Sequence, residues 1–226
     1  MDIISNTLTQ NFELPYHTLI LILSFPIITT IIGFIRYYLG IKTLGIYPHI
    51  MIIYSLYFFA QSTLTSTDFL KGLKYELLFI FAAVVSITIA KYAFDSLNLH
   101  IISKKNLILT IGVLGILLGM ILSSILEKKT IVKVDFIGII GILIVAESYL
   151  TLSIKKGVQS SLRRLVSTIV ICSLIAFLIS NDTYQSILVA NTWIVVIFIF
   201  LNIFIGRYTG LRLSEVIRFG GISNEI

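Results

Sequence analysis

The sequence predicts an all-α polytopic membrane protein, built as a seven-helix transmembrane bundle. Of the 226 residues, 57% are hydrophobic and only 12% are charged, whereas soluble globular domains carry about 25% charged residues. The apolar residues form long runs of the length that a helix needs to cross the hydrocarbon core of a bilayer. The lysines and arginines gather between these runs and are distributed unequally over the two predicted sides of the membrane.

Seven apolar runs are read as spans. The fourth and seventh runs are the clearest, whereas the third carries Lys74 and Glu76 in its first turns and the sixth is poor in strongly apolar residues. A membrane β-barrel would need short alternating segments, which these runs do not show. The seven runs cover residues 14–35, 44–64, 72–93, 106–126, 134–154, 165–183 and 187–206.

The runs divide the chain into three parts. Residues 1–13 form a short extracytoplasmic tail, residues 14–206 form the transmembrane domain, and residues 207–226 form an amphipathic cytoplasmic tail. The N-terminal segment lacks the basic region of a signal peptide, so the first run is expected to be a retained helix.

Charge in the loops predicts the orientation. Seven spans place five of the 17 lysines and arginines on the side of the N-terminus and twelve on the other side. Positive charge accumulates on the cytoplasmic side of membrane proteins. The C-terminus is therefore expected in the cytoplasm and the N-terminus outside, in the plasma (inner) membrane of a bacterium.

Proline and glycine positions predict features of packing. Pro26 lies in the middle of the first run and is expected to bend that helix, because it removes a backbone donor. Gly115 and Gly119 form a GxxxG motif in the fourth run, and Gly138 and Gly141 are similarly spaced in the fifth. Such residues let helices approach closely, either within one bundle or, for Gly115 and Gly119, in a homo-oligomer.

No catalytic or cofactor-binding signature is present. The histidines are far apart, no metal-binding motif such as HExxH occurs, and no glycine-rich nucleotide loop is found. The single cysteine, Cys172, has no partner for an internal disulfide. The positively charged residues lie between apolar runs and do not form a basic patch on a soluble face, as nucleic-acid binding would require. We expect no enzyme activity, no cofactor and no metal.

One ionisable residue inside a span stands out. Glu147 lies eight residues before Lys155, about 12 Å along a helix axis. A charge at such a depth normally faces the bundle interior and finds a partner. Arg36 and Lys91 are the expected partners. The pair either fixes helix register or forms a polar site for a proton, a cation or a substrate. Asn191 and Asn202 are expected to form hydrogen bonds between helices.

Three stretches resemble a known family. FIRYYLGIKTLGIYPHIMI (34–52), LIVAESYLTLSIKKG (143–157) and GRYTGLRLSEVIRF (206–219) are similar to the bacterial seven-transmembrane-helix domain usually fused to an inactive transglutaminase-like domain. Glu147 matches the acidic position of that family. The resemblance implies an extracytoplasmic fusion domain before the helices. Because only thirteen residues precede the first run, we expect any such function to be absent or to come from a separate chain.

A weaker resemblance concerns the membrane subunit of poly-γ-glutamate capsule synthases. The basic-flanked turn GIKTLGIYP (40–48), followed by an acidic residue in a later span, is similar to that subunit. Those subunits act beside a cytoplasmic ATP-dependent amide ligase. The resemblance implies a ligase-like partner for this chain and no catalysis by the chain itself.

The basic segments on the cytoplasmic side are candidate docking sites. In the tail, Arg212, Glu215 and Arg218 follow i,i+3 spacing, opposite an apolar face that can lie in the membrane interface. This tail either anchors the chain or contacts a cytoplasmic protein. The full candidate surface comprises Lys42, Lys155, Lys156, Arg163, Arg164, Arg207, Arg212, Glu215 and Arg218.

Two functions remain open from the sequence. The first is a non-enzymatic membrane subunit or scaffold that recruits a cytoplasmic partner and binds or passes its product. The second is a small transporter or channel with a polar path at Glu147, which the odd number of spans and the lack of visible inverted repeats disfavour.

Overall fold

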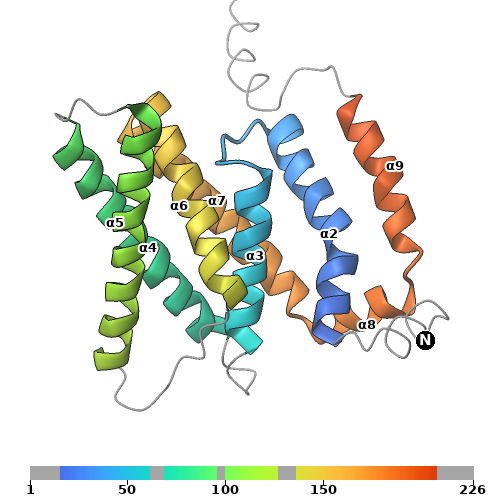
Figure 1. Ribbon diagram of the computed structural model, residues 1–226. Coiled ribbons are helices and arrows are strands. Elements are labelled where there is room, and N and C mark those ends of the chain that lie inside the picture. The colour runs from blue at the N-terminus through green and yellow to red at the C-terminus, as the bar shows by residue number, and fades with distance from the viewer. Residues whose placement is uncertain (1–15, 62–68, 96–99, 127–135, 208–226) are drawn as a thin grey trace, which may run out of the picture. The chain divides into compact units, whose positions relative to one another are not determined.

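The computed structural model describes residues 16–61, 69–95, 100–126 and 136–207, in which every regular element is a helix and no strand occurs. The chain divides into two compact units (Figure 1). Unit 1 comprises Met1–Ile46 and Leu178–Ile226, and unit 2 comprises Tyr47–Phe177. The all-α fold predicted from the sequence is therefore confirmed for the described residues.

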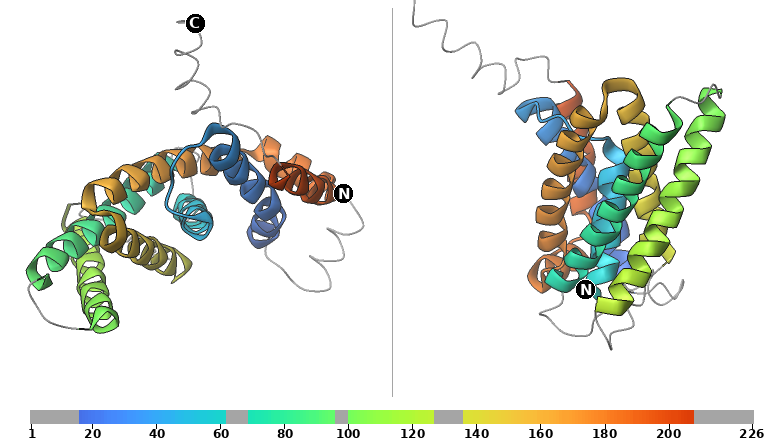
Figure 2. Two further views of the ribbon diagram at one scale, coloured as in Figure 1. Left: turned by 90° about the horizontal axis from the view of Figure 1, so that it is seen from above. Right: turned by 90° about the vertical axis from the view of Figure 1, so that its left-hand side faces the viewer.

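Unit 2 contains the helices α3 (Ile46–Gln61), α4 (Phe69–Phe94), α5 (Ile101–Leu126), α6 (Phe136–Lys156) and most of α7 (Val158–Ile179). Its helices α4 and α5 lie side by side (Figure 1, Figure 2). Large side chains close the core of the unit, among them Tyr57, Phe79, Ile87 and Tyr149, each 1% exposed or less. The unit therefore buries apolar surface between helices that are themselves largely apolar.

Glycines bring α4 and α5 into close contact. A Cβ atom added at Gly115 would lie 2.6 Å from Ser86 Cβ and 2.9 Å from the Ala82 carbonyl oxygen, and one at Gly119 would lie 3.1 Å from Ala82 Cβ. Only a residue without a side chain allows this approach. The GxxxG motif therefore packs against α4 of the same chain, which leaves these two glycines no room for a second chain.

Gly141 allows a similarly close approach of α6 to α3. A Cβ atom at this position would lie 3.1 Å from the Met51 carbonyl oxygen and 3.4 Å from Ser55 Cβ. The backbone of α6 therefore lies directly against α3, at the turn of α3 that carries Ser55.

A single residue joins α6 to α7. Gly157 has φ 82°, a left-handed conformation that glycine adopts without steric cost. Its N–H donates to the Ser153 carbonyl at 3.1 Å, and its carbonyl accepts from the Ser161 N–H at 3.3 Å. Gly157 thus ends α6 and starts α7. The predicted loop before the sixth span is wrong in this respect, because α7 begins at Val158 and already includes Arg163 and Arg164.

Unit 1 is organised around α2 (Tyr16–Phe34), which a five-residue π-helix, η1 (Ile35–Leu39), extends. The helix continues through Pro26, whose carbonyl accepts hydrogen bonds from Thr29 Oγ1 at 2.9 Å and Thr30 Oγ1 at 2.7 Å. Gly40 ends the π-helix with φ 72°. The expected bend at Pro26 therefore does not interrupt the helix.

The last predicted span is broken into two helices in unit 1. They are α8 (Asp182–Ala190) and α9 (Ile194–Gly206), and the chain bends by 96° between them (Figure 1). Asn191 ends α8 in a non-helical conformation, and its Nδ2 donates to the Ile187 carbonyl at 3.1 Å. The expectation of an unbroken span, with Asn191 bonded to another helix, is wrong because a short polar side chain competes for the local backbone.

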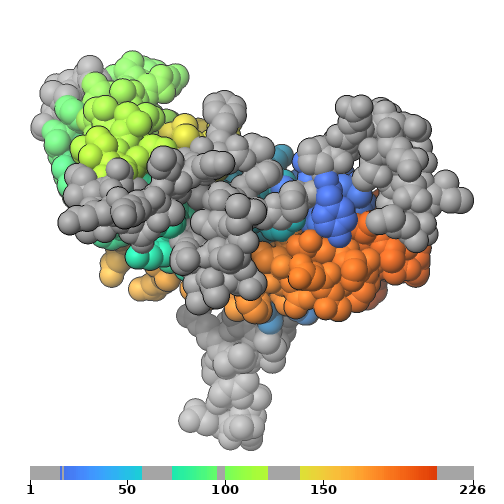
Figure 3. Space-filling model, turned by 90° about the horizontal axis from the view of Figure 1, so that it is seen from below, coloured from blue at the N-terminus to red at the C-terminus, as the bar shows by residue number. Residues whose placement is uncertain are grey.

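Helix α8 packs against α2 within unit 1. The Tyr184 hydroxyl donates to Ser24 Oγ at 3.4 Å, and Gln185 Nε2 donates to the Ile179 carbonyl at 3.0 Å. Leu188 and Val189 are buried on the same side of α8, whereas Thr183 and Ser186 are exposed. Figure 3 shows the outer surface of this segment in orange. The helix is thus amphipathic, as expected where a chain turns at a membrane surface.

Among the described residues, five helices are long and apolar enough to cross a membrane, or six if the bent pair α8–α9 counts as one span. They correspond to the first and to the third to sixth predicted runs. The second run is represented by α3, which is 16 residues long, and its predicted continuation to residue 64 lies outside the described residues. The chain is therefore a multi-pass membrane protein.

Candidate functional sites

The first predicted site residue, Glu147, lies on α6 and is bound by a lysine of α5. Lys105 Nζ donates to Glu147 Oε1 at 2.7 Å, and the side chains are 28% and 53% exposed respectively. The expectation that Lys91 pairs with Glu147 is wrong, because the start of α5 supplies a nearer cation. Arg36, the other expected partner, is half-buried on η1 of unit 1.

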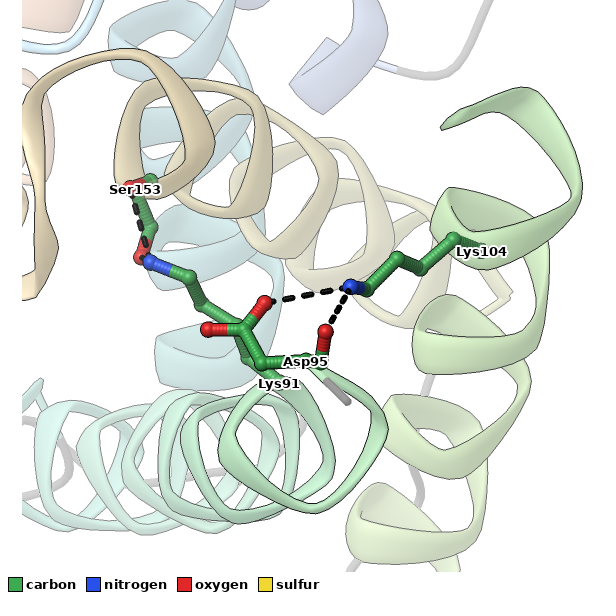
Figure 4. Close-up of polar contacts among 4 residues, drawn as sticks. All are labelled: Lys91, Asp95, Lys104 and Ser153. Atoms are coloured by element: carbon green, nitrogen blue, oxygen red, sulfur yellow. Dashed lines mark hydrogen bonds and ion pairs between the residues drawn. The ribbon is translucent and has the colours of Figure 1, made fainter. Parts of the chain in front are cut away.

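Two further lysines tie the ends of neighbouring helices together (Figure 4). Lys91, at the end of α4, donates from Nζ to the Ser153 carbonyl at 2.9 Å and to Ser153 Oγ at 3.1 Å. Lys104, near the start of α5, donates to the Asp95 carbonyl at 3.1 Å and forms an ion pair with Asp95 Oδ1 at 3.2 Å. A cation at a helix C-terminus also interacts favourably with the helix dipole. These lysines hold α4, α5 and α6 together at one end of unit 2.

The basic residues of the α6–α7 corner have a different environment. We define this corner as Lys155, Lys156, Arg163 and Arg164. The first three are exposed and Arg164 is half-buried. No acidic side chain among the described residues forms an ion pair with any of the four. The corner is therefore a concentration of positive charge that the described part of unit 2 does not neutralise.

The remaining candidate docking residues are spread over unit 1 and the tail. Lys42 is exposed in the segment after η1, and Arg207 is exposed directly after α9. Arg212, Glu215 and Arg218 lie outside the described residues. The structure thus brings together four of the nine candidate docking residues, those of the α6–α7 corner.

A second glutamate, Glu76 on α4, is the residue that reasoning from the sequence missed. Its side chain is 1% exposed, and it lies opposite Ser55 of α3, which is 0% exposed. Ser55 Oγ donates a hydrogen bond to Glu76 Oε1, while Glu76 Oε2 is buried and has no hydrogen-bond partner in the structure. In the sequence, Glu76 counts only as a polar residue that weakens the third predicted span.

The helical pattern of α4 contains a signal for this placement. Glu76, Ala83 and Ala90 recur at seven-residue intervals, and all three are buried. Small residues at such intervals indicate a face that packs on other helices. Lys74 is exposed, because residues two apart do not share a face of a helix. The position of Glu76 on the small-residue face would have predicted its burial.

A buried thiol, Cys172 of α7, lies among the same helices of unit 2. The Cys172 thiol also donates to the His49 carbonyl of α3 at 3.5 Å. Across the described ranges, no group of three or more His, Cys, Asp and Glu residues is arranged to hold a metal ion. Among the described residues of unit 2, Glu76 is thus the one acidic group that is enclosed, in contact with a serine hydroxyl.

The fold and these sites define the class of the protein: a multi-pass helical membrane domain with polar contacts inside one of its units. A family model described as seven transmembrane helices usually fused to an inactive transglutaminase matches residues 7–223. The chain belongs to this family, which confirms the first resemblance drawn from the sequence. Comparison with curated proteins and with solved structures gives no match.

Proposed function

We propose that this chain is a non-enzymatic membrane subunit that recruits a cytoplasmic protein through its α6–α7 corner. The observation that carries the proposal is the contrast among the lysines of unit 2. Lys91, Lys104 and Lys105 bind groups of neighbouring helices, whereas Lys155, Lys156 and Arg163 are exposed, with no ion-pair partner among the described residues. The exposed basic side chains of the corner are available to a partner with an acidic surface.

The rigid attachment of the corner supports this role. Because only Gly157 separates α6 from α7, the basic side chains project from two continuous helices. A surface held in one geometry loses less conformational entropy on binding than a flexible loop. The sequence asymmetry of lysine and arginine supports a cytoplasmic location for this corner and for the C-terminus, in the plasma membrane of a bacterium.

The family supports the absence of catalysis, since its description names an inactive enzyme domain as the usual fusion partner. The partner proposed is an ATP-dependent amide ligase, on the basis of the weaker sequence resemblance. The subunit would hold that ligase at the membrane and would bind or pass its product. Ion pairs at an exposed surface steer association and weaken as salt rises.

Charge reversal tests the docking role. In the variant Lys155→Glu/Lys156→Glu/Arg163→Glu, we expect at least about a tenfold loss of the partner recovered with the tagged chain in mild detergent, equivalent to about 1.4 kcal/mol. The matched control is Lys128→Glu/Lys129→Glu/Lys133→Glu, which changes the same charge on the side predicted to be extracytoplasmic. Full recovery of the partner from the corner variant, or equal loss from both variants, would refute the proposal.

Cysteine labelling tests the orientation on which the proposal depends. In a Cys172→Ser background, a cysteine placed at the exposed Gln159 should be protected from an impermeant thiol reagent in intact cells. A cysteine placed at residue 130 should react. The opposite pattern would place the corner outside the cell and exclude a cytoplasmic partner.

A further inference from the structure

The buried Glu76 carboxyl group belongs to a hydrogen-bond network with fewer donor hydrogens than acceptors. Ser55 Oγ lies within hydrogen-bond distance of two acceptors, the Ile52 carbonyl at 3.0 Å and Glu76 Oε1. A serine hydroxyl has one hydrogen and donates to one of them at a time. If Ser55 donates to Ile52, its oxygen can accept from the carboxyl group only when that group carries a proton, and can share a metal cation with it otherwise.

Among the described residues, no basic side chain forms an ion pair with Glu76. The ion pairs of the described residues involve Glu147 and Asp95, not Glu76. The nearby Lys74 is exposed, whereas Glu76 is 1% exposed. An ionised carboxylate that is buried without a partner costs several kcal/mol. A neutralising cation removes that cost.

Helix α4 carries the carboxyl group, and α3 and α6 lie against each other at the serine that contacts it. Ser55 comes from α3, and Gly141 brings the α6 backbone against the turn that carries it. Two other buried titratable groups of these helices are the Cys172 thiol of α7 and the Tyr75 phenol of α4, whose hydroxyl has no hydrogen-bond partner among the described residues. His49 lies on α3 six residues before Ser55, so a histidine and a thiol belong to the same helix interface.

The site lies close to one end of its span. The apolar span of α4 runs from Leu73 to Phe94, which places Glu76 about 4.5 Å inside it and about 22 Å from Lys91 along the helix axis. A small cation entering from that end has to cross only about one helical turn. A large solute would have to separate helices whose backbones are in contact at Gly141.

We propose that the Glu76–Ser55 pair is a binding site for one small monovalent cation, a proton or a sodium ion. The cation is held by the carboxyl oxygens and the serine hydroxyl, and it neutralises the one acidic group enclosed by these helices. This site is separate from the docking corner and does not depend on the proposed recruitment of a partner.

Carbodiimide labelling tests the proposal on the full chain in nanodiscs of phosphatidylethanolamine and phosphatidylglycerol. Dicyclohexylcarbodiimide adds to a protonated carboxyl group in an apolar setting, and mass spectrometry of the peptides locates the adduct. We expect Glu76 to be labelled, with a rate that falls about tenfold per pH unit in the alkaline range, where the protonated fraction falls by that factor. Glu147, which is paired with Lys105, serves as the unlabelled internal control.

Sodium chloride against choline chloride, at constant ionic strength, separates the two cations. Protection of Glu76 by sodium alone identifies a sodium site. A rate that depends on pH and not on sodium identifies a proton site. Failure to label Glu76, or labelling at one rate at every pH and sodium concentration, would overturn the proposal, because the carboxyl group would then exchange no cation.

Two variants give a second readout. Glu76→Gln is neutral and of similar shape, so its thermal unfolding should lose the response to sodium, or the part of the pH response that wild type and Glu147→Gln share. Equal responses of wild type and Glu76→Gln would contradict the site. If Glu76→Gln fails to fold, the Ser55→Ala variant provides the test. In that variant, protection of Glu76 from labelling should require at least about a tenfold higher cation concentration than in the wild type, a difference of about 1.4 kcal/mol.

Discussion

The two glutamates inside the spans of unit 2 differ in every respect except residue type. Glu76 on α4 is 1% exposed and contacts a serine, whereas the Glu147 side chain on α6 is 53% exposed and binds a lysine. No other charged residue lies close to Glu147 in its span. Glu147 therefore stands out more clearly than Glu76 in the sequence. The comparison shows that the face of the helix on which a charge lies, and not only its depth in a span, decides whether it is enclosed.

The neighbours of each residue along its helix explain the difference. Seven residues after Glu76 lies the buried Ala83, and seven residues after Glu147 lies Ile154, which is 44% exposed. Residues seven apart share one face of a helix. Glu76 therefore belongs to the packed face of α4, and Glu147 borders the exposed face of α6, where a long lysine side chain can reach it.

Reversal of each charge gives the largest expected effect. Glu76→Lys places an uncompensated cation in a closed interface, and we expect a loss of about 3–5 kcal/mol in the free energy of unfolding, or no folded protein. Glu147→Lys opposes Lys105 at a half-exposed position and should cost about 1 kcal/mol or less. Unfolding by SDS titration in mixed micelles measures both. Equal losses would remove the distinction between the two sites.

Removal of the serine hydroxyl sharpens the account of Glu76. Ser55→Ala leaves the buried carboxyl group without its hydrogen-bond donor, and we expect a loss of about 1–2 kcal/mol in the same titration. Ser173→Ala is the matched control, because its hydroxyl bonds only to the Ile169 carbonyl of its own helix at 2.9 Å. Ser173→Ala should change stability by less than about 0.5 kcal/mol. A loss for Ser173→Ala as large as for Ser55→Ala would show that the hydroxyl of Ser55 has no special role.

The ion pair of Glu147 should give the smallest effect. A double-mutant cycle of Glu147→Gln and Lys105→Met should yield a coupling energy of about 0.2–1 kcal/mol, because the pair is partly exposed. The coupling should decrease as salt is added. A coupling above about 2 kcal/mol that is insensitive to salt would indicate that Glu147 is enclosed in the membrane in the same way as Glu76.

The sequence predicts the class of the elements better than their ends. Apolar runs of span length are visible in composition alone, and the α4–α5 contact could be anticipated from Gly115 and Gly119. The break at Asn191 could not, because only one short side chain interrupts an otherwise apolar run. Likewise, the basic residues around Gly157 predict a loop, because clustered charge usually marks the end of a span. In the structure a single glycine connects the two helices.

The candidate sites were predicted only in part. The basic corner follows from the count of lysines and arginines, which is a property of the sequence. The partner of Glu147 depends on how far α5 extends toward α6, and the first turn of α5 lies before the predicted start of that span. The enclosure of Glu76 depends on how α4 packs against its neighbours, α3 among them, which the sequence of one helix does not show.

The joint at Gly157 has a mechanical consequence. Because one residue separates α6 from α7, inserting a single helical residue before Cys172 would turn the rest of α7 by about 100°. The buried Cys172 lies about 21 Å along α7 from this joint. A protein bound at the corner would therefore contact the first turns of a continuous helix that also carries the buried Cys172.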